Sequence, residues 1–401
     1  MIQQSEIAAV ELRIDWEQDG AGHRNRQYFA RTNLWRDILP GALSLQLPES
    51  HGEWIAEHFA PGEVVPPWSE DNIHRVQRDG LRLQRRNGPP VALFRGRHYP
   101  RYIAAGTAGI HPGDIRPLRL LELDVHTATL DLNHPLARSA LTVAARVDHR
   151  LGPANEHGGR CTDLLMDALA GGPGLEALHA AGSTDYFSDD PFARMDPRDD
   201  AQYYRQPRLV QHLDRCVREQ ISELYGRFLQ PGMQVLDLMA SWVSHLPEQP
   251  AGLRVTGLGM NEQELAANPR LQQRVVHDLN LEPRLPFATA AFDAVLCTAS
   301  AEYLVRPVEV IRELARVLKP GAPAVITFSD RCFPDKSIAL WTNLHPFERL
   351  ALVQEYFRAA GDFGLTATET ARGWPRPEDD KYAGRLADAD PLFALWSVRN
   401  G

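Results

Sequence analysis

The chain has 401 residues, of which 43% are hydrophobic and 24% are charged, a composition typical of a globular protein with two or three domains. The formal net charge of -9 argues against broad nucleic-acid binding, which needs a basic face that neutralises phosphates. No apolar run approaches the roughly 20 residues of a membrane span, and the N-terminal stretch lacks the basic and apolar segments of a secretory signal. We therefore expect neither nucleic-acid nor membrane partners.

The cysteines and histidines give no sign of a metal or disulfide framework. The 4 cysteines are scattered and form no CxxC pair. This pattern favours free thiols and a cytoplasmic location. None of the 15 histidines pairs at HxxxH spacing on a clear helix, so the sequence predicts no metal.

Residues 1 to about 150 have the pattern of short strands separated by turns. Apolar residues alternate over residues 10–16, over residues 43–47 and in several runs between residues 118 and 147, as on half-buried strands. Turn residues such as Pro40-Gly41 bound these runs. The pattern predicts a small antiparallel sheet or barrel.

The segment from Thr129 to Val147 reads TLDLNHPLARSALTVAARV. It resembles the DxNHPLAG-plus-strand signature of FKBP-type peptidyl-prolyl isomerases that carry a second domain inserted in the flap. The resemblance implies a β-rich, FKBP-like α+β domain over residues 1–150, with an inserted β subdomain at about 68–133. That family also has a short helix after its first strands, and residues 18–40 leave little room for it.

An isomerase of this kind works by holding a twisted amide in a dry, aromatic pocket, since the barrier in water is ~18–20 kcal/mol. The aromatic residues that could line such a pocket are Trp16, Tyr28, Phe29, Trp35 and Trp54. The alternative is that they form the core of the barrel.

Residues 151–206 read as a connector rich in glycine, proline and acidic residues, including Gly171-Gly172-Pro173-Gly174. A short helix is expected at residues 162–169. The aromatic pairs Tyr186-Phe187 and Tyr203-Tyr204 belong either to a loosely packed linker or to a lid over the next domain.

Residues 207–401 alternate between strand and helix patterns. Apolar residues at helical spacing from Leu209 to Phe228 predict an amphipathic helix. Further along, strands are expected at residues 234–238, 255–258, 293–297 and 324–328, a helix at 306–318, and a closing antiparallel pair beyond Leu365. This alternation predicts an α/β, Rossmann-like doubly wound sheet in a multidomain protein.

Four stretches of this half are VLDL at 235–238, LPF-x4-FDAVLC at 285–297, EYL at 302–304 and RVLKPG at 316–321. In this order they resemble the class I S-adenosylmethionine-dependent methyltransferases, over nearly the whole of residues 207–401. The resemblance implies a class I methyltransferase fold with S-adenosyl-L-methionine as the cofactor.

The turn after the first of these strands departs from that family. Met239, Ser241 and Val243 stand where the family has glycines, and Gly259 stands where an acidic residue usually grips the ribose hydroxyls. Either this branch holds the cofactor with side chains, Ser244 among them, or it has lost it. The residues expected at the cofactor are Asp237, Met239, Ser241, Trp242, Gly259, Met260, Asn261, Asp278, Leu279 and Thr298.

Methyl transfer depends more on alignment than on side-chain chemistry, because the sulfonium is already activated. Glu302 and Tyr303 follow the fourth strand and are the candidate catalytic residues, with Glu302 as a base for a weakly acidic acceptor. The alternative for Glu302 is a solvated helix start. Candidate substrate-binding residues follow the fifth strand: Arg331, Phe333, Lys336 and Trp341. The two cations suit an anionic acceptor, and otherwise they are surface charge.

Two functional hypotheses follow. The first is a cytoplasmic methyltransferase that acts on a small molecule, or on a peptide held by the FKBP-like domain. The second is a peptidyl-prolyl isomerase or peptide-binding folding helper with a non-catalytic methyltransferase-like scaffold. The replaced glycines and Gly259 favour the second hypothesis.

Overall fold

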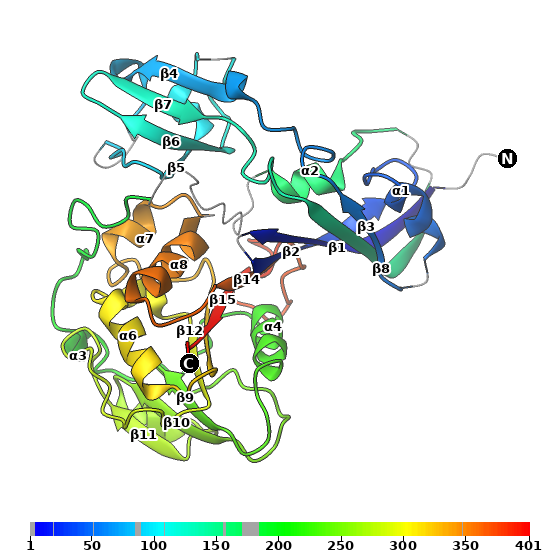
Figure 1. Ribbon diagram of the computed structural model, residues 1–401. Helices are drawn as coiled ribbons and strands as arrows, with labels where there is room; N and C mark the ends of the chain where they lie inside the picture. Colours follow the sequence, from blue (N-terminus) through cyan, green and yellow to red (C-terminus); the bar gives the residue numbers. More distant parts are fainter. Residues whose placement is uncertain are drawn as a thin grey trace. The chain divides into compact units, whose positions relative to one another are not determined.

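The computed structural model describes residues 5–18, 20–50, 52–84, 90–107, 109–154, 158–170, 184–346 and 348–401. The chain divides into two compact units, and Figure 1 labels most of their helices and strands. The N-terminal unit comprises residues 1–19, 23–191 and 343–351, and the C-terminal unit comprises residues 20–22, 192–342 and 352–401. The expected connector is thus divided between them, and its Gly171–Gly174 run lies outside the described residues.

The N-terminal unit is β-rich, and its long strands follow in the order β2-β1-β8-β3. These strands are β1 (Ser5–Gln18), β2 (Ala21–Asn33), β3 (Ile55–Phe59) and β8 (Leu141–Ala154). β1 and β8 pair antiparallel, with Ile14 opposite Val143. The alternating residues of both strands are buried in one core, together with Trp16. This core also receives α2 (Leu164–Leu169), which is capped by Asp163.

A second sheet of four strands, in the order β4-β7-β6-β5, is built entirely from residues between β3 and β8. Its strands are β4 (Ile73–Gln77), β5 (His98–Pro100), β6 (Pro117–Leu123) and β7 (Thr127–Asp131). It has its own core around Ile103, Leu120 and Leu130. Asn133 fixes the place where the chain enters and leaves this sheet, because its side chain accepts from the Ser69 N–H and donates to the Ser69 carbonyl, both at 2.9 Å.

The expected strand at residues 43–47 is instead a short helix, α1 (Leu43–Gln46), followed by a 3-10 turn, η1 (Leu47–Glu49). Leu43 and Leu47 are buried while Leu45 is 80% exposed. Three alternating leucines also satisfy the i, i+4 spacing of a helix, and so short a run does not separate the two patterns. The helix follows Pro40, so residues 18–33 are free to form the β1–β2 hairpin.

The C-terminal unit is a doubly wound sheet with the strand order β11-β10-β9-β12-β13-β15-β14. Its strands are β9 (Gln234–Leu238), β10 (Arg254–Gly259), β11 (Gln273–Val276), β12 (Ala294–Thr298), β13 (Pro323–Phe328), β14 (Ala367–Arg372) and β15 (Leu392–Val398). The strands from β11 to β13 are parallel, and β15 pairs antiparallel with both β13 and β14. This is the Rossmann-like architecture that the sequence predicts, including its closing antiparallel pair.

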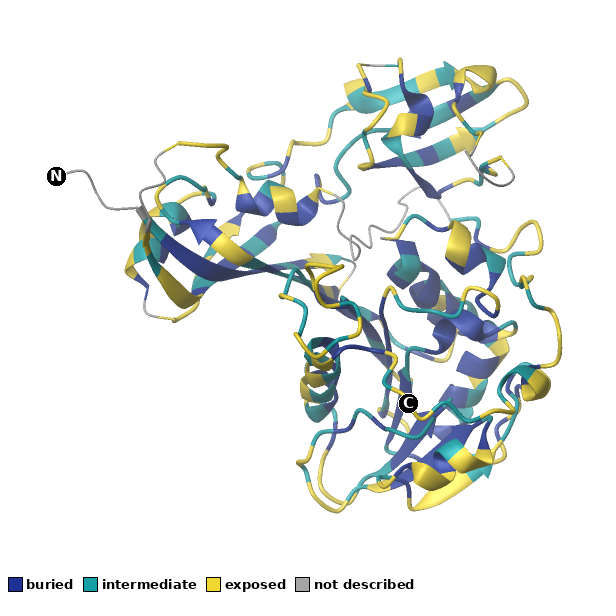
Figure 2. Cartoon of the chain, turned by 180° about the vertical axis from the view of Figure 1, so that it is seen from behind, coloured by how far each residue is buried: buried dark blue, intermediate teal, exposed yellow. Residues whose placement is uncertain are grey.

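Helices pack against this sheet, and Figure 2 shows the buried strands beside helices with exposed outer faces. The helices described in this part of the chain are α3 (Asp200–Tyr203), α4 (Arg215–Gly226), α5 (Glu262–Ala267), α6 (Pro307–Val317), α7 (Ala339–Asn343) and α8 (Glu348–Ala360), of which α4 and α5 contribute to the core cluster of β9, β10 and β12. α4 begins six residues later than the apolar spacing predicts, because Asp214 caps it by accepting from the Val217 N–H at 3.0 Å. Leu209 and Val210 are exposed and irregular. Among the described residues, no helix has the length and apolar character that crossing a bilayer requires.

Candidate functional site

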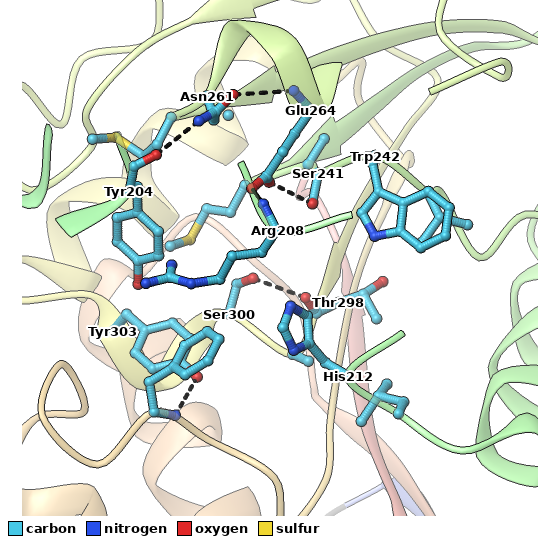
Figure 3. A pocket seen from close by; sticks show the side chains of 18 of the residues that line it. Tyr204, Arg208, His212, Ser241, Trp242, Asn261, Glu264, Thr298, Ser300 and Tyr303 are labelled. Atoms are coloured by element: carbon cyan, nitrogen blue, oxygen red, sulfur yellow. Dashed lines mark hydrogen bonds between the residues drawn. The ribbon is translucent and has the colours of Figure 1, made fainter. Parts of the chain in front are cut away.

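The strand order of the C-terminal unit reverses between β9 and β12, and the crevice at the carboxyl ends of such strands is where open α/β sheets bind ligands. A cavity of about 410 Å³ lies there, within the ~300–1,000 Å³ typical of small-molecule sites. Figure 3 shows some of the side chains that line it. Its wall includes every residue that the sequence predicts at the cofactor: Asp237, Met239, Ser241, Trp242, Gly259, Met260, Asn261, Asp278, Leu279 and Thr298.

The turn after β9 keeps a glycine-like backbone without its glycines. Met239 has φ 56°, the left-handed conformation that side chains disfavour. Ala299, directly after β12, has φ 47°. Both residues line the cavity, and strain of this kind is commonly concentrated at functional sites. Met239 therefore adopts a backbone conformation that glycine adopts without strain.

Gly259 ends β10 at a point where no side chain fits. A Cβ placed on this residue would lie 2.1 Å from the Ala240 carbonyl oxygen. The contact arises because the Ala240 N–H donates to the Leu258 carbonyl at 2.7 Å, which draws the turn after β9 against the end of β10. This geometry leaves no room for an acidic side chain at residue 259.

The side chains behind the turn form a buried polar network. Ser244 Oγ donates to Asp237 Oδ2 at 2.5 Å, and Asn268 Nδ2 donates to Ser244 Oγ at 3.0 Å and to the Ser241 carbonyl at 2.9 Å. Burial raises the pKa of Asp237 to about 7, and the Ser244 hydrogen bond offsets this only in part. The cavity therefore contains a carboxyl group that titrates near neutrality.

Ser241 and Asn261 are both engaged by neighbouring protein groups. Ser241 Oγ donates to Glu264 Oε2 at 2.6 Å, and the Arg208 N–H donates to Glu264 Oε1 at 2.7 Å. Asn261 caps α5 by accepting from the Gln263 and Glu264 N–H groups. Its amide also donates to the Tyr204 and Arg205 carbonyls at 2.8 and 3.1 Å, which holds the segment before α4 over the cavity.

That segment, residues 203–213, is hereafter the cover segment. The Arg208 guanidinium lies 4.5 Å from the Tyr203 ring centre, 5.6 Å from that of Tyr204 and 5.1 Å from that of Phe333. Contacts at these distances are attractive cation–π interactions. The His212 ring meets Phe333 edge-on at 5.2 Å, and burial together with Lys381 and Arg208 lowers the pKa of His212, which favours the neutral imidazole. One end of the cavity is thus both aromatic and basic.

Of the two candidate catalytic residues, only Tyr303 lines the cavity. Its hydroxyl accepts from the Phe333 N–H at 2.8 Å, and its ring stacks on Phe333. Burial and the charge of Glu302 raise the pKa of Tyr303 well above its ordinary value, so it is a neutral phenol that can donate a hydrogen bond. Glu302 is fully buried and lies off the cavity wall, in place of the expected position at the mouth.

The candidate substrate-binding residues are also divided. Arg331 and Phe333 line the cavity, although Arg331 Nε donates to Asp390 Oδ1 at 2.9 Å. Lys336 is fully buried and binds Asp200 Oδ1 at 3.0 Å, because the chain after β13 turns inward. Trp341 is buried against Phe328, with the ring centres 4.9 Å apart. Lys336 and Trp341 are therefore structural residues of the interior rather than acceptor contacts.

Several residues of the wall were not predicted from the sequence: Tyr204, Arg208, His212, Glu264, Lys381 and Tyr382. The only sequence signal for them was the aromatic pair at 203–204, which one alternative interprets as a lid. Among the described residues, no group of three or more His, Cys, Asp or Glu side chains is arranged to hold a metal ion.

Comparisons with known proteins point to one class. Residues 240–326 match the family described as "Methyltransferase domain". Demethylmenaquinone methyltransferase of Paenarthrobacter aurescens is 28% identical over 162 residues, which is 39% of this chain and 62% of that protein. Its counterpart from Mycolicibacterium paratuberculosis is 28% identical over 193 residues, 47% of this chain and 79% of that protein. The chain thus spans less than two thirds of the first relative's length.

Solved structures with a similar fold include a SAM-dependent methyltransferase from Aquifex aeolicus, at 16% identity and TM-score 0.32, covering 50% of this chain and 97% of that chain. Another, a SAM-dependent methyltransferase from Thermotoga maritima, has 15% identity and TM-score 0.33. The match covers 46% of this chain and 92% of that chain. The match over residues 240–326 and the strand order around it identify a methyltransferase domain with a Rossmann-like fold in the C-terminal unit.

Proposed function

We propose that the C-terminal unit binds S-adenosylmethionine in the cavity at the β9–β12 crevice and transfers its methyl group to a small, planar, anionic acceptor. The observation that carries this proposal is the open cavity itself. At its rim, Met239 has the positive φ that glycine favours, and Gly259 lies close to the Ala240 carbonyl oxygen. The side chains that replace the glycines line this space without filling it, since about 410 Å³ remain.

The residues present suit an adenosyl sulfonium. When bound, this group supplies a methyl on a positively charged sulfur, which keeps the bonding electron pair as the methyl leaves. The buried Asp237 carboxyl offers a counter-charge in the same cavity. Asp278, whose Oδ1 accepts from the Asn280 N–H at 2.9 Å, is positioned by that turn on the cavity wall and suits the adenine end.

The aromatic and basic end of the cavity suits the acceptor. Tyr204, Tyr303 and Phe333 offer flat surfaces that exclude water, and Arg208 offers a positive charge among them. The neutral phenol of Tyr303 can donate a hydrogen bond to an acceptor oxygen. With Glu302 buried off the wall, an acceptor that is already ionised at neutral pH needs no strong base. The relatives' name, which gives demethylmenaquinone as what they methylate, also favours a conjugated ring system.

The test is to incubate the full chain with S-adenosylmethionine and a panel of hydroxylated naphthoates and benzoates, and to measure S-adenosylhomocysteine by mass spectrometry. Matched neutral esters of the same rings serve as controls. We expect turnover with the anions and little with the esters. Turnover restricted to the esters would contradict the acceptor class, and a folded protein that binds no S-adenosylmethionine would contradict the proposal as a whole.

For the N-terminal unit we propose a peptide-binding role of the FKBP-like kind, as a second candidate function. The inserted four-stranded sheet between β3 and β8, tied at Ser69 and Asn133, supports it. The five aromatic candidates do not gather at one surface, since Trp16 and Phe29 contribute to the core while Trp35 is 50% exposed. A proline-peptide isomerisation assay on the full chain tests this role. If the peptide isomerises only at its uncatalysed rate, the N-terminal unit has no isomerase activity.

A further inference from the structure

The ribose of an adenosyl ligand presents two hydroxyl groups, and a carboxylate that accepts from both is the usual protein partner. At the end of β10 this partner cannot exist, because a side chain on Gly259 would collide with the Ala240 carbonyl. If the cavity binds S-adenosylmethionine as proposed above, another acceptor must serve the ribose.

Four carboxyl groups line the cavity: Asp200, Asp237, Glu264 and Asp278. Asp200 is committed to Arg194 at 2.8 Å and to Lys336 at 3.0 Å. Asp237 is 6% exposed, and its Oδ2 accepts from Ser244 Oγ at 2.5 Å. Asp278 folds back on its own chain, where its Oδ1 accepts from two backbone N–H groups. Glu264 lies beside the end of β10, and its carboxylate is hydrogen-bonded to Ser241 Oγ and the Arg208 backbone N–H rather than to a basic side chain.

The surroundings of Glu264 orient it for this task. It lies in the first turn of α5, which begins just after β10 ends. Ser241 Oγ holds Oε2 at 2.6 Å from the side of the β9 turn, and the Arg208 N–H holds Oε1 at 2.7 Å from the side of the cover segment. Each carboxylate oxygen accepts two hydrogen bonds, so each keeps one acceptor position.

We propose that Glu264 is the ribose-binding acid of this chain, displaced by about one helical turn from the position that Gly259 vacates. The displacement links three departures from the usual pattern. Gly259 lets the β9 turn approach β10, Ser241 replaces a glycine and fixes the carboxylate, and Glu264 supplies the charge. Because Glu264 also binds the backbone of Arg208, ribose recognition is coupled to the position of the cover segment.

The experiment is calorimetric titration of the full chain with S-adenosylhomocysteine and with its 2′-deoxy and 3′-deoxy analogues. For the unmodified protein we expect affinity to fall about 10- to 100-fold when a hydroxyl is removed, the range of a hydrogen bond to a charged group. Glu264→Gln should lower the affinity for S-adenosylhomocysteine by a similar factor and show little further loss with the deoxy analogues. Glu262→Gln, an exposed acid on the same turn, is the matched control and should behave like the unmodified protein.

If Glu264→Gln keeps the full discrimination between S-adenosylhomocysteine and its deoxy analogues, the assignment is overturned. A variant that fails to fold is recognised by circular dichroism. In that case Ser241→Ala decides: it removes the hydroxyl that fixes the carboxylate, so the discrimination should weaken, and full discrimination in this variant would overturn the assignment. An unmodified protein that binds S-adenosylhomocysteine while ignoring both hydroxyls would refute the inference and leave the proposed function intact. No binding at all would refute the proposed function.

Discussion

At the scale of single residues, two positions shape the cavity of the C-terminal unit: one has a side chain where the backbone disfavours it, and the other has no side chain. Met239 adopts a left-handed conformation despite its side chain, at a cost of about 1–2 kcal/mol. Gly259 has no side chain because the Ala240 carbonyl occupies the place of its Cβ. Met239 thus has a side chain where the backbone favours glycine, and Gly259 lacks one where the backbone leaves no room.

Gly259→Ala should therefore damage this cavity more than an ordinary glycine substitution would. Its Cβ would meet backbone 2.1 Å away, which cannot yield like a flexible side chain, so we expect a loss of about 1–3 kcal/mol and strongly weakened cofactor binding. Thermal unfolding and calorimetric titration check both effects. Gly226→Ala, at the end of α4 with its nearest neighbour 3.8 Å away, is the control and should be neutral or slightly stabilising.

Asp237 should make cofactor affinity depend on pH. Its pKa is about 7 in the folded protein, so the carboxyl is largely protonated below that pH, and a nearby sulfonium favours the ionised form. Binding then releases a proton, and S-adenosylmethionine affinity should rise by up to about tenfold per unit from pH 5 to 7 and level off above. S-adenosylhomocysteine, whose sulfur is neutral, should show a flatter profile. Identical profiles for both ligands, or an unchanged profile in Asp237→Asn, would argue against this role.

At the scale of elements, α5 and the cover segment are held together by one side chain. Asn261 caps the helix with its oxygen and holds the Tyr204 and Arg205 carbonyls with its nitrogen. The cover segment has no regular hydrogen-bonding pattern of its own over residues 204–213 apart from turns. Its position over the cavity therefore depends on such side-chain contacts, including the one from Trp242 Nε1 to the Val210 carbonyl at 3.1 Å.

Asn261→Ala should loosen the cover segment. The lost cap costs about 1 kcal/mol, and the two lost hydrogen bonds should speed amide hydrogen exchange over residues 203–210. Mass-spectrometric hydrogen exchange on the full chain measures this directly. Asp163→Ala removes a comparable cap from α2 in the other unit and should leave exchange over 203–210 unchanged. Equal protection of the cover segment in both variants would contradict its dependence on Asn261.

At the scale of the whole molecule, each unit includes residues that are distant in sequence. Residues 343–351 belong to the N-terminal unit, where the fully buried Glu348 accepts from the His98 N–H at 2.8 Å and pairs with Arg97 at 3.4 Å. Burial lowers the pKa of His98 to about 4, so it is neutral and Arg97 supplies the charge. Burial opposes ionisation of Glu348, but Arg97 and the His98 hydrogen bonds outweigh it and its pKa is lowered.

Glu348→Gln should destabilise the protein by about 3–5 kcal/mol, because it leaves the Arg97 charge buried and uncompensated. Since the folded pKa of Glu348 lies below its unfolded value, this stabilisation is present above about pH 4.5 and is lost as the pH falls further. Denaturant unfolding at pH 7 and pH 4 checks both statements. Glu355→Gln breaks a partly exposed pair with Arg358 on the same helix and should cost under about 1 kcal/mol.

The sequence predicts the sheet of the C-terminal unit well, because its buried strands are continuous apolar runs bounded by turns. The residues at the strand ends could be assigned to a common cavity, since parallel strands place their carboxyl ends together. The cover segment was not predicted in detail, because an irregular segment has no periodicity. Lys336 and Glu302 were misplaced for another reason: whether a polar side chain turns inward depends on partners far away in sequence, such as Asp200 for Lys336.

The most direct test of the account is a calorimetric titration of the full, folded chain with S-adenosylmethionine. We predict saturable binding at one site per chain, competed by S-adenosylhomocysteine. No heat of binding at millimolar S-adenosylmethionine, from protein whose circular dichroism is native, would contradict the central claim that the β9–β12 cavity is a cofactor site.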